Sequence, residues 1–165
     1  MKRTIIFTLC AVATLSLAAC GGEAVTAQKA AAEETAQIPN PFIDCETLDE
    51  AVGIAGFEMT VPEEMEGYDK PVINTIENEM IQVIYYKGED EVRIRKGAGS
   101  EDISGDYNEY AKTDVVTVEG MQVTIRGNDG KASVATWTNE EYTYSITVGE
   151  GIDISSMTDL VRAVK

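Results

Sequence analysis

Carboxylates are the most abundant reactive side chains of this chain, which holds 29 aspartate and glutamate residues and no histidine. Without histidine, a serine or cysteine nucleophile has no imidazole base, and zinc centres bound through imidazole are excluded. A carboxylate pair could still hydrolyse a glycosidic bond. Among so many acids such pairs are too common to indicate a site, and the chain has neither a glycine-rich phosphate loop nor a G-x-S-x-G motif. We therefore expect a non-catalytic protein without a cofactor.

The segment EDISGDYNEY at 101–110 places oxygen-bearing side chains at alternate positions, namely Asp102, Ser104, Asp106 and Asn108. A calcium loop of the EF-hand type needs glycine at its sixth position and an acid at its twelfth. Counted from Asp102, these positions hold Tyr107 and Thr113. We therefore expect no regular calcium loop and assign no metal ligands. The alternative is an irregular calcium site in this segment.

Two tyrosines of the same segment, Tyr107 and Tyr110, are candidates for binding a partner, because tyrosine offers rigid contact area at low entropic cost. The alternative is that they fix an ordered connection to the edge of a sheet. The stretch also contains the turn-forming residues Ser104-Gly105-Asp106.

The tightest basic cluster consists of Arg93, Arg95 and Lys96, which we expect on the outward face of one strand. Such a cluster is a candidate anion site. The alternative is pairing with carboxylates on neighbouring strands. Trp137, followed by Tyr142 and Tyr144 after a short turn, predicts aromatic packing across a hairpin, with ligand stacking as the alternative.

The N-terminus has the features of an export signal. Lys2 and Arg3 precede an uncharged apolar stretch that is shorter than the ~20 residues of a membrane-spanning helix. It ends in Leu17-Ala18-Ala19-Cys20, which resembles the lipobox of bacterial lipoproteins. The resemblance implies cleavage before Cys20 and attachment of a diacylglycerol to its thiol, so that the mature protein is anchored to the cell membrane on its extracytoplasmic face. The alternative is an ordinary cleaved signal that happens to contain a cysteine.

The formal net charge of −16 becomes still more negative once Lys2 and Arg3 leave with the signal. This balance argues against nucleic acid as a partner. Cys10 leaves with the signal and Cys20 carries the lipid, so Cys45 remains as a single thiol and no disulfide within the chain is expected.

These features predict that the chain has three parts. Residues 1–19 form the signal peptide, and residues 20–41 form the lipidated cysteine with a tether rich in alanine and glutamate. Residues 42–165 are long enough for a single domain with its own core.

Two helices are predicted in that domain. Thr47 and Glu50 fit a capping box, and apolar residues recur at helical spacing up to a stop at Gly56. Near the C-terminus, Met157, Leu160, Val161 and Val164 lie on one helical face, with Ser156 and Asp159 as a predicted cap.

Between the helices the apolar period changes to two, which predicts strands in PVINTI, MIQVIYYK, EVRIRK, VVTV, MQVTIR, KASVATW and YTYSITV. Glu119-Gly120 is a two-residue hairpin link. Alternation of this kind is typical of an antiparallel sheet with one buried face. We therefore predict an α+β fold, in which an N-terminal and a C-terminal helix cover one face of an antiparallel sheet.

From Asn40-Pro41-Phe42 through the helix at 47–57, EDISGDYNEY and GNDGKASVATWTNEEYTYSI at 127–146, the chain resembles an uncharacterised bacterial family, a domain of unknown function. Its members occur in secreted proteins, in lipoproteins and in the extracytoplasmic parts of anti-sigma-type regulators. The resemblance implies fold and location and no activity. We expect a binding or sensing module that engages an envelope protein or a wall component. The alternative is a structural or accessory lipoprotein without a specific ligand.

Overall fold

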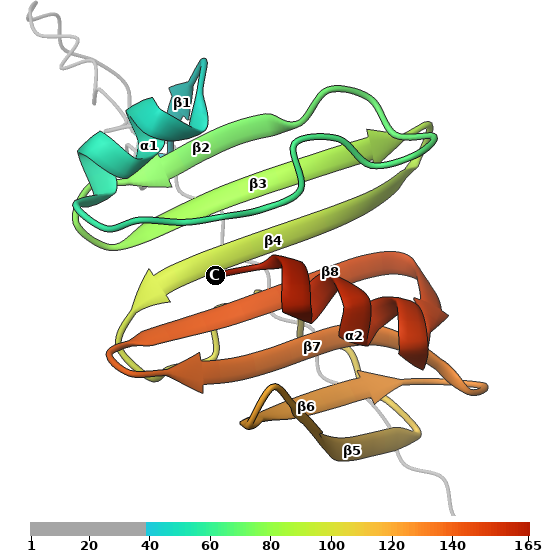
Figure 1. The fold of residues 1–165 in the computed structure, drawn as a ribbon. Coiled ribbons are helices and arrows are strands. Elements are labelled where there is room, and N and C mark those ends of the chain that lie inside the picture. The colour runs from blue at the N-terminus through green and yellow to red at the C-terminus, as the bar shows by residue number, and fades with distance from the viewer. Residues whose placement is uncertain (1–38) are drawn as a thin grey trace, which may run out of the picture. The chain divides into compact units, whose positions relative to one another are not determined.

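The computed structural model describes residues 39–165, which form one compact unit (Figure 1). Its elements in chain order are β1 (Ile43–Cys45), α1 (Leu48–Ala55), β2 (Val72–Ile76), β3 (Met80–Lys87), β4 (Asp90–Ala98), β5 (Lys112–Val118), β6 (Met121–Gly127), β7 (Lys131–Asn139), β8 (Tyr142–Asp153) and α2 (Ile154–Ala163). The predicted antiparallel sheet is confirmed, together with two helices.

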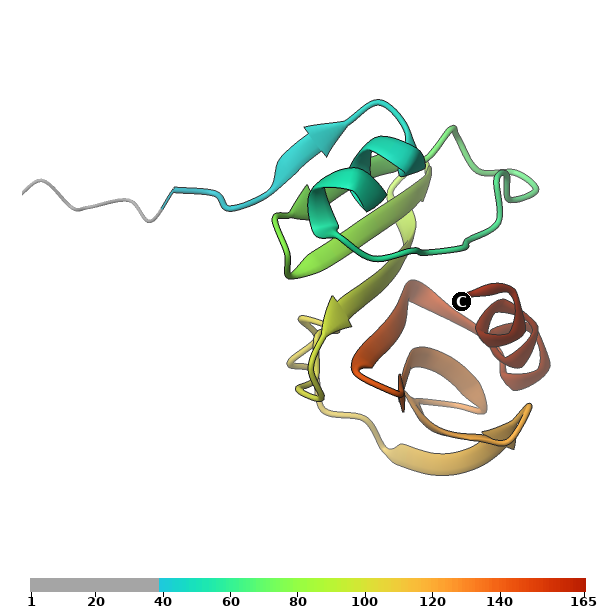
Figure 2. The same cartoon turned by 60° about the vertical axis from the view of Figure 1, so that its left-hand side comes forward.

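The eight strands form a single sheet in the order β1-β2-β3-β4-β8-β7-β6-β5, and every neighbouring pair is antiparallel. Each half of the chain is a meander of four strands, and the halves join where β4 pairs with β8. The connection from 99 to 111 therefore runs from the centre of the sheet to its far edge. Figure 2 shows that the second half curls towards α2.

The first helix begins and ends where the sequence predicts. The Thr47 hydroxyl accepts a hydrogen bond from the backbone N–H of Glu50 at 3.2 Å. The Glu50 carboxylate accepts one from the backbone N–H of Glu46 at 2.8 Å, which completes a capping arrangement one residue before the cap. Gly56 closes the helix in the left-handed conformation, with φ of 79°.

The second helix begins earlier than predicted. Its cap is Asp153, whose side chain makes no capping hydrogen bond, so the predicted cap at Ser156 and Asp159 is wrong. The reason is that β8 runs directly into α2 without a loop. Met157, Val161 and Val164 are buried as the spacing predicts. Within residues 39–165, neither helix has the length and apolar character needed to cross a membrane.

One face of the sheet carries the apolar core. Across the central strands, Val83, Ile94, Ile146, Ala135 and Ile125 lie opposite one another in register, and all are buried. Helix α1 contacts β1, β2 and β3, and α2 contacts β5, β7 and β8. Figure 1 draws both helices in front of the sheet.

The other face carries polar side chains in one row across the strands: Asn74, Gln82, Arg95, Ser145, Thr136 and Thr124. We expected this face to be open at β8, but Thr143 and Ser145 are buried, with exposures of 3% and 1%. The cause is the connection 99–111, which crosses here. The Thr143 hydroxyl donates to the carbonyl of Gly99 at 2.7 Å. The connection therefore lies on this face and does not only border the sheet, as Figure 2 also shows.

Candidate functional site

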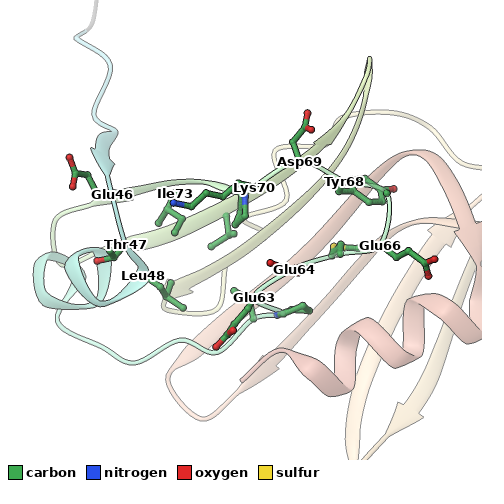
Figure 3. A pocket seen from close by; sticks show the side chains of 16 residues that line it. Glu46, Thr47, Leu48, Glu63, Glu64, Glu66, Tyr68, Asp69, Lys70 and Ile73 are labelled. Carbon is green, nitrogen blue, oxygen red and sulfur yellow. The ribbon is translucent and has the colours of Figure 1, made fainter.

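A groove of about 1000 Å³ lies between the start of α1 and the segment 61–71 (Figure 3). Its inner wall is apolar, with side chains from Leu48, Val61, Pro62, Met65, Ile73 and Val83. A groove of this size falls within the range of small-molecule and peptide sites. We call it the α1 groove.

Hydrogen bonds to β3 hold the 61–71 segment in place near both of its ends. The hydroxyl of Tyr85, fully buried in β3, donates to the carbonyl of Pro62, and burial raises the pKa of Tyr85 to about 12. The backbone N–H of Asp69 donates to the carbonyl of Tyr86 at 2.8 Å. Before the groove, Thr60 and Lys165 exchange two backbone hydrogen bonds, of 2.9 and 3.1 Å. The wall of the groove is therefore tied to β3 near both of its ends.

The rim of the α1 groove is acidic. It carries Glu46, Glu63, Glu64, Glu66 and Asp69, against a single base, Lys70. None of these side chains takes part in the ion pairs found among residues 39–165. Figure 3 shows the carboxylates of Glu46, Glu66 and Asp69 pointing outward at the rim. An apolar floor with an unneutralised acidic rim complements a ligand that has apolar and basic groups.

The predicted basic cluster is divided between the two faces of the sheet. Arg93 and Arg95 lie on the polar face, as expected. Lys96 lies on the apolar face and is 7% exposed, so the prediction that it faces outward with the arginines is wrong. The reason is the alternation along β4, in which Val92, Ile94 and Lys96 share one side.

The hydrogen bonds of the Arg95 side chain hold the 99–111 connection on the sheet. Its Nε donates to Gln82 Oε1 at 2.7 Å, and a terminal nitrogen donates to the carbonyl of Ile103 at 2.8 Å. Gln82 in turn donates to Asn74 Oδ1 at 2.6 Å. Burial, together with the charge of Arg93, lowers the pKa of Arg95.

Arg93 pairs with Glu91 at 2.6 Å. Its Nε and the hydroxyls of Ser145 and Thr147 are buried without a hydrogen-bond partner. Thr147 lies directly opposite Arg93 in the register, so two of these unpartnered atoms belong to neighbouring strands. The two arginines stay anion-binding candidates from sequence alone.

Lys96 lines a separate cavity of about 470 Å³ on the apolar side, which we call the Lys96 cavity. Its Nζ donates to the carbonyl of Glu58 at 2.6 Å. The rings of Trp137 and Tyr144 stack beside it, with centroids 5.1 Å apart and planes at 5°. The cross-strand aromatic packing predicted from the sequence is therefore present.

The two tyrosines of the 101–110 segment differ in their surroundings. Tyr107 is 96% exposed. Tyr110 is half-buried, and its hydroxyl donates to Asp106 Oδ2 at 3.0 Å; burial and Asp106 together raise its pKa. Tyr110 is thus part of the connection's own structure, whereas Tyr107 is free to contact a partner.

The oxygen-bearing side chains of this segment make hydrogen bonds within the connection and to the sheet. Asp102 Oδ1 accepts from the backbone N–H of Ser104 at 2.8 Å, and Oδ2 accepts from Arg126 at 3.2 Å. Burial acts to raise the pKa of Asp102, but the hydrogen bonds from Ser104 and the charge of Arg126 outweigh it and lower the pKa. Among residues 39–165, no group of three or more potential ligands is placed to hold a metal ion.

Of the two cysteines expected in the mature chain, Cys45 is a free, half-buried thiol at the end of β1. Burial and the nearby carboxylates of Glu50 and Asp44 raise its pKa, so it is poorly ionised at neutral pH. Cys20, the predicted site of lipidation, lies outside the described residues.

The α1 groove was not predicted from the sequence. Its wall is an irregular segment, and no periodic pattern indicates where such a segment packs. The alternation along the strand could have predicted the position of Lys96. Val92 and Ile94 were assigned to the buried face, and Lys96, two residues after Ile94, must lie on that same face.

We compared the chain with family models, with curated proteins and with solved structures, and none of the three comparisons gave a match. The resemblance to an uncharacterised bacterial family therefore stays a prediction.

Proposed function

We propose that this protein is a lipid-anchored lipoprotein of the cell envelope that binds a partner, without catalysis, at the α1 groove. The lipobox Leu17–Cys20 supports the anchor and the extracytoplasmic location. The observation that carries the binding role is the groove itself, with its apolar floor and acidic rim. The partner has a segment with apolar and basic side chains, which the −16 net charge of the chain also favours.

We also infer that the two helices close the apolar face of the sheet and leave the groove at one end of this layer. Support comes from Ala51 and Ala55 of α1 and from Met157 and Val161 of α2, all of which are buried in the same core as the central strands. In this arrangement the groove stays open because the segment 61–71, which follows α1 over the apolar face, is irregular chain and not a helix.

Charge reversal on two exposed surfaces tests the binding role. Glu63→Lys with Glu66→Lys changes the rim of the groove, and Glu101→Lys with Glu109→Lys makes the same change in charge on the 99–111 connection. All four side chains are exposed, so both double variants should keep the melting temperature of the parent. The measurement is chemical crosslinking on intact cells, followed by identification of the captured partner.

We expect the groove variant to lose the crosslink and the connection variant to keep it. If only the connection variant loses the crosslink, the partner binds at the surface that carries Tyr107 and not at the groove. If both variants keep every crosslink of the parent, the groove is not a binding site, and the structural or accessory role replaces the proposal.

A further inference from the structure

Lys96 is a buried charge without a counter-ion among the described residues. It is 7% exposed and takes part in none of the ion pairs found there. Of the three N–H donors of an ammonium group, one is used by the carbonyl of Glu58 at 2.6 Å. Nζ also lies over three aromatic rings, at 4.6 Å from the centroid of Tyr142, 5.1 Å from that of Tyr144 and 5.7 Å from that of Phe57. Buried charges are normally paired, so this ammonium is suited to accept an anionic group.

The cavity beside it has the size and lining of a small-molecule site. Its volume is about 470 Å³, within the range of roughly 300–1,000 Å³ that is usual for such sites. Trp137 and Tyr144 form one wall, and Met121 and Val164 add apolar surface. The lining therefore combines apolar contact area with one fixed positive charge.

The other charges of the cavity select the kind of ligand. Lys165 and Glu119 pair with each other at 2.7 Å. Glu58 also lines the cavity, is exposed and takes part in none of the ion pairs found in the described part of the chain, so it is the remaining acid of the lining. The net charge of −16 repels ligands with net negative charge, whereas a ligand with one charge of each sign is not repelled.

We propose that the Lys96 cavity is a binding site for a small zwitterion of the amino-acid class. The ligand carboxylate pairs with Lys96, its ammonium pairs with Glu58, and its side chain packs against Trp137, Met121 and Val164. This site is separate from the α1 groove and does not depend on the function proposed there. In the rival account, the aromatic rings and the Glu58 carbonyl alone satisfy Lys96, and the cavity holds only water.

Trp137 is the single tryptophan of the chain, so its fluorescence reports directly on the cavity. The experiment titrates the full-length protein with leucine, with N-acetyl-leucine, which lacks the ammonium, and with leucinamide, which lacks the carboxylate. We expect a saturable change in Trp137 emission with leucine and at least about tenfold weaker binding of both blocked forms.

Two variants assign the contacts. Lys96→Met removes the charge and keeps an unbranched apolar side chain one atom shorter, and we expect it to abolish the response to leucine. Glu58→Gln changes an exposed side chain and keeps the backbone carbonyl that holds Lys96, so it should fold even if Lys96→Met does not. We expect it to remove the preference for leucine over N-acetyl-leucine. Glu63→Gln, on the rim of the α1 groove, is the matched control and should bind leucine as the parent does.

The proposal is overturned if leucine gives no saturable response. It is also overturned if either blocked form binds as tightly as leucine, or if folded Lys96→Met responds like the parent. Unchanged discrimination in Glu58→Gln would equally remove the zwitterion assignment. None of these results affects the test of the α1 groove, because the readouts and the residues are different.

Discussion

At the scale of single residues, Arg95 joins the connection 99–111 to the sheet. It donates hydrogen bonds to the side chain of the buried Gln82 and to the carbonyl of Ile103. Gly105 packs closely on the guanidinium, since a Cβ at Gly105 would lie 2.7 Å from a terminal nitrogen of Arg95. Removing this side chain leaves two acceptors without their charged donor. The connection is thus held by specific polar contacts and little apolar burial.

We therefore expect Arg95→Met to lower the free energy of unfolding by about 1.5–3 kcal/mol, the usual contribution of hydrogen bonds to a charged group. Urea unfolding at neutral pH is the measurement. Arg162→Met is the matched control, because Arg162 is exposed on α2 and should change stability by less than about 0.5 kcal/mol. Equal midpoints for the two variants would show that Arg95 does not hold the connection.

Asp102 makes the free energy of unfolding depend on pH in the acid range. Its pKa in the folded protein is below the ordinary value of 3.8, so the folded state binds this proton less readily than the unfolded state. The stabilisation is therefore fully present above that ordinary value and is lost as the pH falls through the lower pKa of the folded state.

The prediction is that the stability gap between the parent and Asp102→Asn is constant above about pH 5 and closes towards about pH 2. Urea unfolding across this range measures the gap. A gap that stays the same at every pH would mean that Arg126 and Ser104 do not stabilise the ionised carboxylate.

At the scale of elements, local patterns predicted most of the strands and both helices, because alternation and helical spacing are recorded in consecutive residues. The two-residue hairpin link is confirmed: Glu119 and Gly120 have φ values of 49° and 87°, as a tight turn between β5 and β6 requires. Strand β1 was missed because three residues are too few for a periodic pattern.

Packing between distant segments could not be predicted in the same way. Thr143 and Ser145 have the polar types of an open face, yet a connection from elsewhere in the chain buries them. The α1 groove and the Lys96 cavity are both formed by residues far apart in sequence. Site geometry of this kind depends on tertiary contacts that no local pattern records.

Two glycines test the elements that contain them. Gly127 ends β6, and a Cβ there would lie 1.9 Å from the backbone oxygen of Lys131, which cannot move without disturbing the next strand. Gly53 lies within α1 with nothing within 4 Å of an added Cβ. We expect Gly127→Ala to cost about 2 kcal/mol or more and Gly53→Ala to stabilise by about 0.5–1 kcal/mol.

Thermal and urea unfolding of the two variants provide the comparison, since both make the same chemical change. If Gly127→Ala unfolded at the same midpoint as the parent, the close approach of β6 to the start of β7 would be incorrect. A loss of stability in Gly53→Ala would mean that this face of α1 is more crowded than the structure indicates.

At the scale of the whole molecule, the proposed function combines an anchor at one end of the chain with a binding domain at the other. The net negative charge of the chain opposes adsorption to anionic lipid, so the proposal assigns the membrane attachment to a covalent lipid anchor. Two acyl chains give stable attachment where one chain gives only marginal binding.

Cys20→Ala tests this anchor. The lipobox interpretation requires the Cys20 thiol, and cleavage follows lipid attachment, so the variant should accumulate as an unprocessed precursor without lipid. Cys45→Ala is the matched control, because it removes the other thiol of the expected mature chain and should be processed normally. The measurements are the mass of the protein and its partition between membrane and soluble fractions. A Cys20→Ala protein that is processed and retained in the membrane like the parent would leave an ordinary signal peptide as the explanation, and the groove would then belong to a protein attached by another route.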